Sequence, residues 1–343
     1  MRKLLNTLYI LSNDLYLSLE NHNVVVQRNR EEISRYPLHT LESICVFSRK
    51  GISIPLIAQC CQDGIPIFIM SNNGTLLARI SLPSQGNILL RKEQYRIADD
   101  PHRALEIGAI MIRGKIENMK HQLDRFRWAH EKEERASLLE IHSNAMDQLA
   151  ERIGKANTAA ELLGIEGEAS ALYFSCFDSM ILNPDKTFFF HVRSRHPPLN
   201  PTNAMLSFAY TLLTNECAAA LESVGLDASA GFLHQDHPGR KSLACDLLEE
   251  LRQTVSDRFV LRMVNQRVFS KEHFEQHEEK GIYLNNEGRR LFLQHWQKEK
   301  QEQLTHHILK EHIPAGLIPY AQAKLLASYI RGDSTRYHVF VRR

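Results

Sequence analysis

The stretch DDPHRALEIGAIMIRGKIENMKHQLDRFRWAH, residues 99–130, decides the fold class of this chain. Asp100-Pro101 marks a boundary, because proline disfavours helical backbone at the residue before it. Residues 104–130 then contain no proline, and apolar side chains recur with the 3.6-residue period of an α-helix. The side chains that carry this period are Leu105, Ile112, Ile116, Met119, Leu123 and Phe126. We therefore predict a long helix and a change of structural class at its start.

The residues before this stretch are predicted to form a small sheet domain. Short apolar segments typical of strands occupy residues 15–19, 24–26, 66–70 and 75–80. Residues 20–23 separate the first pair and Asn72-Asn73-Gly74 separates the second, so each pair is predicted to form a hairpin. A brief apolar period over residues 54–63, closed by Gly64, predicts one helix packed on the sheet.

The residues after the stretch are predicted to be helical. Helical periodicity covers residues 136–153, 159–177, 203–224, 242–255 and 289–313. We therefore predict an α+β protein, with a small β-rich domain over residues 1–100 and a larger all-α domain over residues 101–343. The length of 343 residues agrees with two domains, because it exceeds what one hydrophobic core usually fills.

Composition narrows the class of protein. The chain is 43% hydrophobic and 24% charged, which is typical of globular proteins and excludes an extensively disordered one. The 42 Lys and Arg residues nearly balance 40 Asp and Glu residues, which gives a formal charge of +2. Any nucleic-acid partner must therefore be held by a local basic patch rather than by overall charge.

We find no membrane span, signal peptide or C-x-x-C motif in the sequence. No window reaches the roughly eighteen unbroken apolar residues of a membrane span, and the first residues lack the apolar core of a signal peptide. The six cysteines contain no C-x-x-C pair, so we expect reduced thiols without zinc or disulfides. These features predict a cytoplasmic protein that does not enter a membrane.

Glu166 is the first candidate functional residue. It lies in a helical run between Gly164 and Gly167, and each interior glycine costs about 1 kcal/mol of helix propensity relative to alanine. Close approach of another backbone segment or of a ligand to Glu166 would explain both glycines. The alternative is an irregular helix joint that carries surface glutamates.

His234 and a nearby acidic helix are the next candidates. His234 ends an apolar segment, and Ser242 is predicted to cap the helix that follows. On that helix Asp246, Glu249 and Glu250 are spaced i, i+3 and i+4, so they share one face. The alternatives are a hydrogen-bonded structural histidine and a solvated acidic face.

Taken together, these residues predict a metal site. A neutral imidazole and two carboxylates suit Mg²⁺ or Mn²⁺, and the nitrogen ligand favours Mn²⁺. The chain has no C-x-x-C, H-E-x-x-H, Walker loop or G-x-S-x-G motif to support zinc, nucleotide or acyl-transfer chemistry. An oxygen-rich metal site of this kind indicates phosphoryl chemistry.

Basic residues near these motifs could contact a phosphate backbone. Arg193 and Arg195 follow a run of three phenylalanines, and Arg240 and Lys241 precede the acidic helix directly. If they gather on one face, they are candidates for DNA binding. The alternative is an ordinarily charged surface.

Four motifs, in this order and spacing, resemble the CRISPR-associated protein one family, which integrates new spacers. They are GIEG at residues 164–167, NAMLSFAY at 203–210, GFLH at 231–234 and SLACDLLE at 242–249. The resemblance covers essentially the whole chain. LLNTLY at residues 4–9 and GNILLRK at 86–92 look most like the type I-C branch.

The resemblance implies a fold and a site. The family has an N-terminal β-domain used for homodimerisation and a helical catalytic domain, which would be residues 1–100 and 101–343 here. Its divalent metal is bound by a glutamate, a histidine and a third carboxylate, which match Glu166, His234 and Glu249. Asp246 matches an additional acidic position, either as a partner of a ligand or as an alternative ligand.

The resemblance also implies an activity and partners. The chain would be a metal-dependent DNA integrase and endonuclease that inserts short DNA fragments at the CRISPR repeat, by attack of a 3′-hydroxyl on a phosphodiester. Its partners would be double-stranded DNA, as prespacer and CRISPR repeat, a second copy of the chain and CRISPR-associated protein two. A type I-C assignment would add CRISPR-associated protein four.

Two other functions stay open on the sequence. One is a non-catalytic DNA-binding assembly subunit whose acidic residues only cap helices and pair with arginines. The other is a small-molecule metallohydrolase, which keeps the metal but not the DNA.

Overall fold

The structure is a computed structural model that describes residues 6–71, 76–81, 88–276 and 281–342. The predicted turn Asn72-Asn73-Gly74 lies outside the described residues, as do residues 4–5 and 86–87 of the two stretches that resemble the type I-C branch. No helix in the described part of the chain is long and apolar enough to span a membrane.

The chain divides into two compact units. The first comprises Met1–Gln85, Leu284–Glu302 and Pro314–Leu317. The second comprises Gly86–Tyr283, Gln303–Ile313 and Ile318–Arg343. These bounds differ from a division at residue 100, and the assignment of dimerisation to one part and catalysis to the other stays a prediction.

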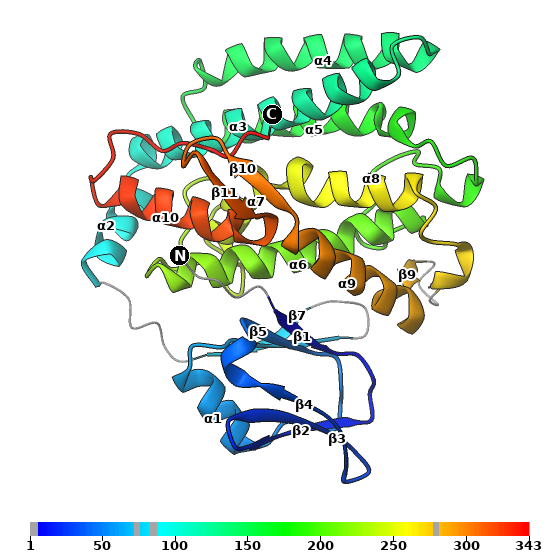
Figure 1. Cartoon of the computed structure of the whole chain (residues 1–343). Helices are drawn as coiled ribbons and strands as arrows, with labels where there is room; N and C mark the ends of the chain where they lie inside the picture. The colour runs from blue at the N-terminus through cyan, green and yellow to red at the C-terminus, as the bar shows by residue number, and fades with distance from the viewer. Residues whose placement is uncertain (1–5, 72–75, 82–87, 277–280, 343) are drawn as a thin grey trace. The chain divides into compact units, whose positions relative to one another are not determined.

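The first unit contains an antiparallel three-stranded sheet (Figure 1). Its strands are β2 (Leu15–Glu20), β3 (Asn23–Arg28) and β4 (Glu31–Pro37). Glu20 pairs with Asn23 across the first turn, in which Asn21 and His22 have positive φ angles of 47° and 57°. The predicted hairpin between residues 15–19 and 24–26 is confirmed.

A second sheet of this unit has the strand order β1-β5-β6-β7. Its strands are β1 (Thr7–Ile10), β5 (Ser43–Val46), β6 (Ile67–Met70) and β7 (Leu76–Ile80). β5 pairs in parallel with both β1 and β6, whereas β7 is antiparallel to β6. The pairing of β6 with β7 agrees with the prediction. The parallel pairs were not predicted, because local periodicity does not show which distant strands pair.

Helix α1 (Ile54–Gln62) also belongs to this unit and confirms the predicted helix. The Ser53 side chain caps it by accepting a hydrogen bond from the backbone N–H of Leu56, and Gly64 beyond its end has a φ of +68° that favours glycine. The apolar core between the sheets and α1 includes Leu17, Val24, Ile44, Leu56, Cys60 and Ile67, which are all fully buried. A short 3₁₀ helix, η1 (Leu38–Thr40), follows β4.

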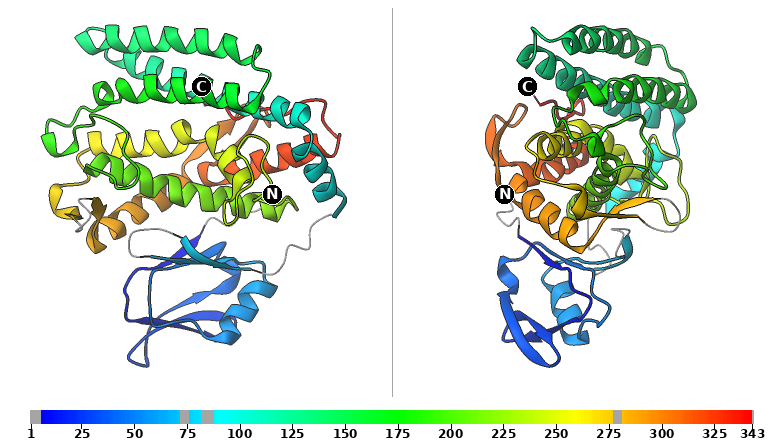
Figure 2. Two further views of the ribbon diagram at one scale, coloured as in Figure 1. Left: turned by 180° about the vertical axis from the view of Figure 1, so that it is seen from behind. Right: turned by 90° about the vertical axis from the view of Figure 1, so that its right-hand side faces the viewer.

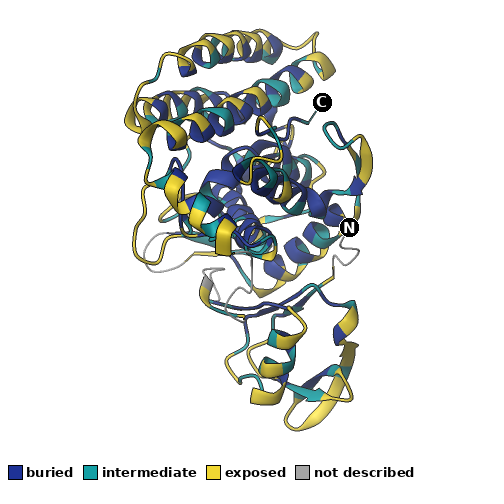
Figure 3. Ribbon diagram, turned by 90° about the vertical axis from the view of Figure 1, so that its left-hand side faces the viewer, coloured by how far each residue is buried: buried dark blue, intermediate teal, exposed yellow. Residues whose placement is uncertain are grey.

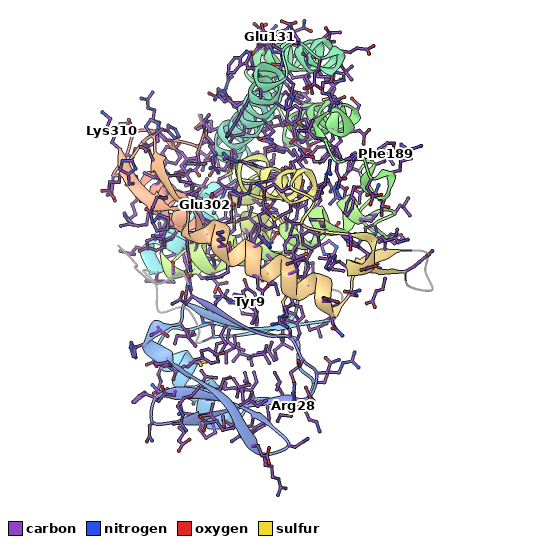
Figure 4. The ribbon with its side chains drawn as sticks, turned by 45° about the vertical axis from the view of Figure 1, so that its right-hand side comes forward. Tyr9, Arg28, Glu131, Phe189, Glu302 and Lys310 are labelled. Carbon is purple, nitrogen blue, oxygen red and sulfur yellow. The ribbon has the colours of Figure 1, made fainter. Side chains whose placement is uncertain are left out.

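The predicted helix over residues 289–313 is wrong beyond its first half. Helix α9 (Asn286–Gln301) ends where Glu302 becomes extended, and a hairpin of β10 (Gln303–His306) and β11 (Glu311–Pro314) follows. Figure 4 labels Glu302 at the end of α9 and Lys310 in the hairpin turn. Lys310 has a φ of 54°, so the turn is left-handed although it lacks the glycine or asparagine that usually marks one. The 3₁₀ helix η6 (Ala315–Leu317) comes next.

The second unit is mostly helical, as predicted. Its α-helices are α2 (Ile88–Ala98), α3 (Pro101–Ala129), α4 (Glu134–Ile153), α5 (Ala159–Ser175), α6 (Pro201–Ser223), α7 (Ser242–Glu249), α8 (Arg258–Asn265) and α10 (Ile318–Ile330). Shorter elements are the helices η2 (Phe177–Met180), η3 (Lys186–Phe188) and η5 (Lys271–His273) and the strand pair β8 (Phe274–Gln276) and β9 (Ile282–Leu284). The predicted α+β fold class is therefore confirmed, although short strands interrupt its helical part.

Helix α3 is the longest helix described in this unit, and several others pack against it. It contacts α2, α4, α5 and α7, and both views of Figure 2 show α3, α4 and α5 as adjacent helices. Its Asp100 side chain accepts hydrogen bonds from two backbone N–H groups of the first turn. Figure 3 shows that the helices inside the unit are mostly buried. The predicted apolar stripe of α3 faces this interior, with Ile112, Ile116, Met119 and Leu123 buried.

The predicted helix over residues 242–255 is interrupted. Helix α7 ends at Glu249, and the π-helix η4 (Arg252–Asp257) follows before α8 begins. π-Helical turns are rare and often lie at functional sites. This one places Arg252 beside Glu249, the candidate ligand at the end of α7.

Candidate functional site

Two of the predicted ligands, Glu166 on α5 and Glu249 on α7, both contact a lysine on α3. The Lys115 ammonium on α3 donates hydrogen bonds to Glu166 Oε1 on α5 and, at 2.5 Å, to Glu249 Oε2 on α7. The side chains of Lys115 and Glu249 are 1% and 4% exposed, whereas that of Glu166 is 20% exposed. Two carboxylates from distant parts of the sequence therefore converge on a single buried cation.

A second cation holds the other oxygen of Glu249. Arg252 Nη2 lies 2.8 Å from Glu249 Oε1, so each carboxylate oxygen has a positively charged partner. Burial alone would raise the pKa of Glu249, but the charges of Arg252 and Lys115 outweigh it and hold the pKa at about 2. Glu249 is therefore ionised throughout the physiological range.

His234 is held in place by Asp246, which is fully buried. The His234 Nδ1 and Asp246 Oδ1 atoms are 2.6 Å apart, and Asp246 also accepts the backbone N–H groups of Phe232, Leu233 and His234. This bond engages Nδ1 and leaves Nε2 as the nitrogen that can bind a ligand. His234 is also near enough to Glu249 to help lower the pKa of that carboxyl.

Gly231 allows this close arrangement. A Cβ atom at this position would lie 2.7 Å from the Cβ of Ser242 and 3.0 Å from Asp246 Oδ2, so no larger residue fits. Ser242 itself is the first residue of α7 and not its N-cap as predicted. Its hydroxyl instead donates to the carbonyl oxygen of Gln235 at 3.1 Å, which ties the loop after His234 to the helix.

The side chains of Glu166, Glu249 and His234 are of the types that bind divalent cations. In the described chain no three His, Cys, Asp or Glu side chains lie close enough together to hold a metal ion as they stand. However, Glu166 and Glu249 already converge on a cation, and His234 can offer Nε2. Two carboxylates and an imidazole are ligands that Mg²⁺ and Mn²⁺ accept. The donor set therefore fits such an ion if Lys115 moves away from the carboxylates.

Helix α5 is continuous through Gly164 and Gly167, so the alternative of an irregular helix joint is wrong. A Cβ atom at either glycine would meet nothing within 4 Å, and the predicted close approach of another segment is not seen among the described residues. Glu166 Oε1 also accepts a hydrogen bond from the Ser170 hydroxyl at 2.8 Å. Contacts within the described chain therefore do not explain the two glycines.

The alternative of a solvated acidic face is also wrong, since Asp246, Glu249 and Glu250 are all buried with separate partners. Glu250 Oε1 accepts hydrogen bonds from the Tyr337 hydroxyl at 2.5 Å and from Gln322 at 3.0 Å. Its Oε2 accepts the backbone N–H of residue 340 at 3.1 Å. Burial raises the pKa of Glu250 to about 7, against the lowering effect of these hydrogen bonds. Glu250 therefore binds the C-terminal segment and does not take part in the candidate site.

Arg252 is in turn fixed by an aromatic stack. The guanidinium carbons of Arg252 and Arg193 lie 5.0 Å and 5.2 Å from the centre of the Tyr210 ring. The Tyr210 hydroxyl donates to Asp257 Oδ1 at 2.6 Å. Cations over an aromatic face are attracted by its negative charge density. The stack therefore holds Arg252 in position beside Glu249.

The four predicted DNA-binding residues differ in their surroundings. Arg195 and Arg240 are exposed. Arg193 is half-buried and donates to Asn203 Oδ1 at 2.9 Å and to Ser207 at 3.1 Å, and Lys241 Nζ lies 3.2 Å from Asn215 Oδ1. A contact of any of them with DNA stays a prediction.

Sequence reasoning missed Lys115, which joins the two carboxylates, and Arg252, which pairs with Glu249. Lys115 interrupts the apolar stripe of α3 between Ile112 and Met119, where a charged residue is almost never buried without a partner. That position was the signal that could have revealed it. Arg252 follows Glu249 by three residues, a spacing that places oppositely charged side chains side by side.

Comparison with known proteins gives consistent matches. The family model described as "CRISPR associated protein Cas1" matches residues 8–298. The chain is 40% identical over 341 residues to CRISPR-associated endonuclease Cas1 2 of Rhodospirillum rubrum, with 98% of each chain covered. It is 38% identical over 343 residues to CRISPR-associated endonuclease Cas1 1 of Chlorobaculum tepidum, with 100% of each covered.

One further relative is a fusion. The CRISPR-associated exonuclease Cas4/endonuclease Cas1 fusion of Geobacter sulfurreducens is 30% identical over 339 residues, which are 98% of this chain and 60% of the fusion.

Solved structures share the fold. A CAS1 protein from Thermotoga maritima superposes with a TM-score of 0.82 at 22% identity, covering 98% of this chain and 100% of that one. A casposase bound to integration product gives 0.82 at 21% identity, covering 96% and 92%. A chain of a Cas6-RT-Cas1–Cas2 complex gives 0.83 at 22% identity, covering 98% of this chain and 36% of that one. At these identities the likeness concerns the fold alone.

Proposed function

The chain belongs to the CRISPR-associated protein Cas1 family, and from this premise we propose that it is a metal-dependent DNA integrase and endonuclease of CRISPR adaptation. The observation that carries the proposal is the convergence of Glu166 and Glu249 on one buried cation, beside a histidine whose Nε2 is left available. The names of the relatives, which are endonucleases, agree with it.

In the proposed reaction, Glu166, Glu249 and His234 Nε2 would hold the metal ion. A bound Mg²⁺ or Mn²⁺ would polarise the scissile phosphate and stabilise the negative charge that develops on it. Asp246 accepts a hydrogen bond from His234 Nδ1–H, which fixes the orientation of the ring and leaves Nε2 for the metal ion. Asp246 is therefore proposed as the partner of a ligand rather than as a ligand itself.

The nucleophile in integration is the 3′-hydroxyl of a short DNA fragment. Its oxygen loses its proton to solvent and forms a bond to the phosphorus at the edge of a CRISPR repeat, while the bond from phosphorus to the leaving 3′-oxygen breaks and that oxygen takes up a proton. Water as the nucleophile gives hydrolysis from the same site. No protein residue needs to become covalently attached in either reaction.

We also propose the assembly. Double-stranded DNA, as prespacer and CRISPR repeat, a second copy of the chain and Cas2 are the partners, and Cas4 is added if the chain is of type I-C. One chain with the same fold belongs to a Cas6-RT-Cas1–Cas2 complex, and one relative is a fusion of exonuclease Cas4 with endonuclease Cas1. The exposed Arg195 and Arg240 are candidates for phosphate contacts.

A non-catalytic DNA-binding assembly subunit is the alternative function. One observation favours it: Lys115 and Arg252 neutralise Glu166 and Glu249, as purely structural ion pairs would. In that case the purified protein would bind DNA but would neither join nor cleave it with Mn²⁺ present.

Two variants of the full chain test the proposal. Glu166→Gln and His234→Ala should each lower Mn²⁺-dependent strand transfer at least about a hundredfold while DNA binding stays near wild type, because each removes one metal ligand. Glu168→Gln is the matched control, since Glu168 lies on the same helix but is half-exposed and pairs with Arg152. Wild-type strand transfer by both ligand variants would exclude the proposed site.

A further inference from the structure

Lys115 is placed where a metal ion would have to bind. Its ammonium lies between the carboxylates of Glu166 and Glu249, and its side chain is 1% exposed. A buried ammonium is stable only with close anionic partners, and a divalent ion needs the same oxygens. Lys115 and the ion therefore compete for Glu166 Oε1 and Glu249 Oε2.

The charges around Lys115 show what must accompany a divalent ion that displaces it. Glu166 and Glu249 carry two negative charges, and Lys115 and Arg252 carry two positive ones, so the group is neutral without a metal ion. Entry of a divalent ion would add two positive charges to this largely buried group, and the buried Asp246 beside His234 could offset only one of them, which is strongly unfavourable. An anion must therefore accompany the ion, and the phosphodiester of the substrate DNA is the anion that the proposed function supplies.

We propose that Lys115 makes metal binding and DNA binding depend on each other. Without DNA it occupies the position between the two carboxylates and keeps the affinity for divalent ions low. When a DNA phosphate enters, the displaced ammonium gains an anionic partner and the ion takes its place. This inference rests on the proposed function, since it assumes the same ligands and a DNA substrate.

Binding of Mn²⁺ to the metal-free full chain tests the inference without any measurement of activity. Free Mn²⁺ is read from its electron paramagnetic resonance signal, with and without a duplex whose ends lack the 3′-hydroxyl, and binding to the duplex alone is subtracted. In the wild type, saturating duplex should strengthen Mn²⁺ binding about five- to a hundredfold, which is the usual range of coupling between sites. Equal affinity with and without duplex would overturn the inference, whatever the variants do.

Lys115→Met is the central variant, because methionine has a similar length and no charge. It should bind Mn²⁺ at least about tenfold more tightly than wild type without DNA, and the duplex should then strengthen its Mn²⁺ binding by a smaller factor than in wild type, because only the direct contact between ion and phosphate remains. Lys120→Met is the matched control: Lys120 lies on the same helix and pairs with Asp147 instead. It should behave as wild type. Unchanged or weaker Mn²⁺ binding by a folded Lys115→Met protein would also overturn the inference.

Glu166→Gln separates this inference from the proposed function. If Glu166→Gln loses Mn²⁺ binding but Lys115→Met gains none, the metal site stands and the role of Lys115 is wrong. If wild type and Glu166→Gln bind Mn²⁺ equally in the presence of the duplex, the proposed site itself is wrong and the inference is wrong with it.

Discussion

Glu249 and Glu250 are neighbours in the chain, are both buried, and have opposite properties. The partners of Glu249 are the cations Lys115 and Arg252, which hold its pKa at about 2. The partners of Glu250 are neutral donors, among them the Tyr337 hydroxyl, and burial raises its pKa to about 7. Burial alone therefore does not decide what a carboxylate does. The charge of its partners does, and it separates a candidate catalytic region from a structural one at the end of a single helix.

Substituting each glutamate by glutamine gives the largest expected effect. Glu249→Gln should lower Mn²⁺-dependent strand transfer at least about a hundredfold, because it removes a proposed ligand. Glu250→Gln should retain most of the activity but lower the free energy of unfolding by about 1–3 kcal/mol, because its amide NH₂ would face a backbone N–H donor. Strand-transfer rates and urea unfolding of both variants measure this. Equal loss of activity in the two variants would mean that the two regions are not distinct.

A smaller expected effect is the pH dependence of the free energy of unfolding, to which Glu249 and Glu250 should contribute with opposite signs. Both carboxyls titrate near pH 4.5 when unfolded. The stability that Glu249 contributes is present above this pH and is lost as the pH falls towards 2. The contribution of Glu250 is present below pH 4.5 and is lost as the pH rises through about 7.

Raising the pH from 5 to 8 should therefore destabilise the wild type relative to Glu250→Gln, by up to about 1.4 kcal/mol per pH unit while Glu250 titrates. Urea unfolding across this range measures the difference. Glu168→Gln is the control, since Glu168 is half-exposed and its removal should leave the wild-type slope. Parallel curves for wild type and Glu250→Gln would show that Glu250 does not titrate in this window.

Local patterns in the sequence predicted most of the elements. The period of α3, the first hairpin and α1 were predicted because their signals lie within the segments themselves. The parallel pairing of β5 with β1 and β6 depends on strands far apart in the chain, which local periodicity does not report. The hairpin after α9 was missed because Lys310 adopts a left-handed turn without a typical turn residue.

The candidate site was predicted only in part. Glu166 and Glu249 were chosen from the sequence, and the structure places both on one ammonium. The source of that ammonium, Lys115, was missed because a lysine in an apolar stripe can also extend to the surface. The separate partners of Glu249 and Glu250 were also missed, because a helical spacing of three or four residues does not specify what packs against each side chain.

A crystal structure of the full chain with Mn²⁺ and DNA, with the ion located by its anomalous scattering, tests the proposed site most directly. We expect one ion at about 2.0 to 2.3 Å from a Glu166 oxygen, a Glu249 oxygen and His234 Nε2. Lys115 should have left the two carboxylates, and Asp246 should still bind His234 Nδ1. An ion bound elsewhere, or Lys115 still between Glu166 and Glu249 at saturating Mn²⁺, would contradict the proposal.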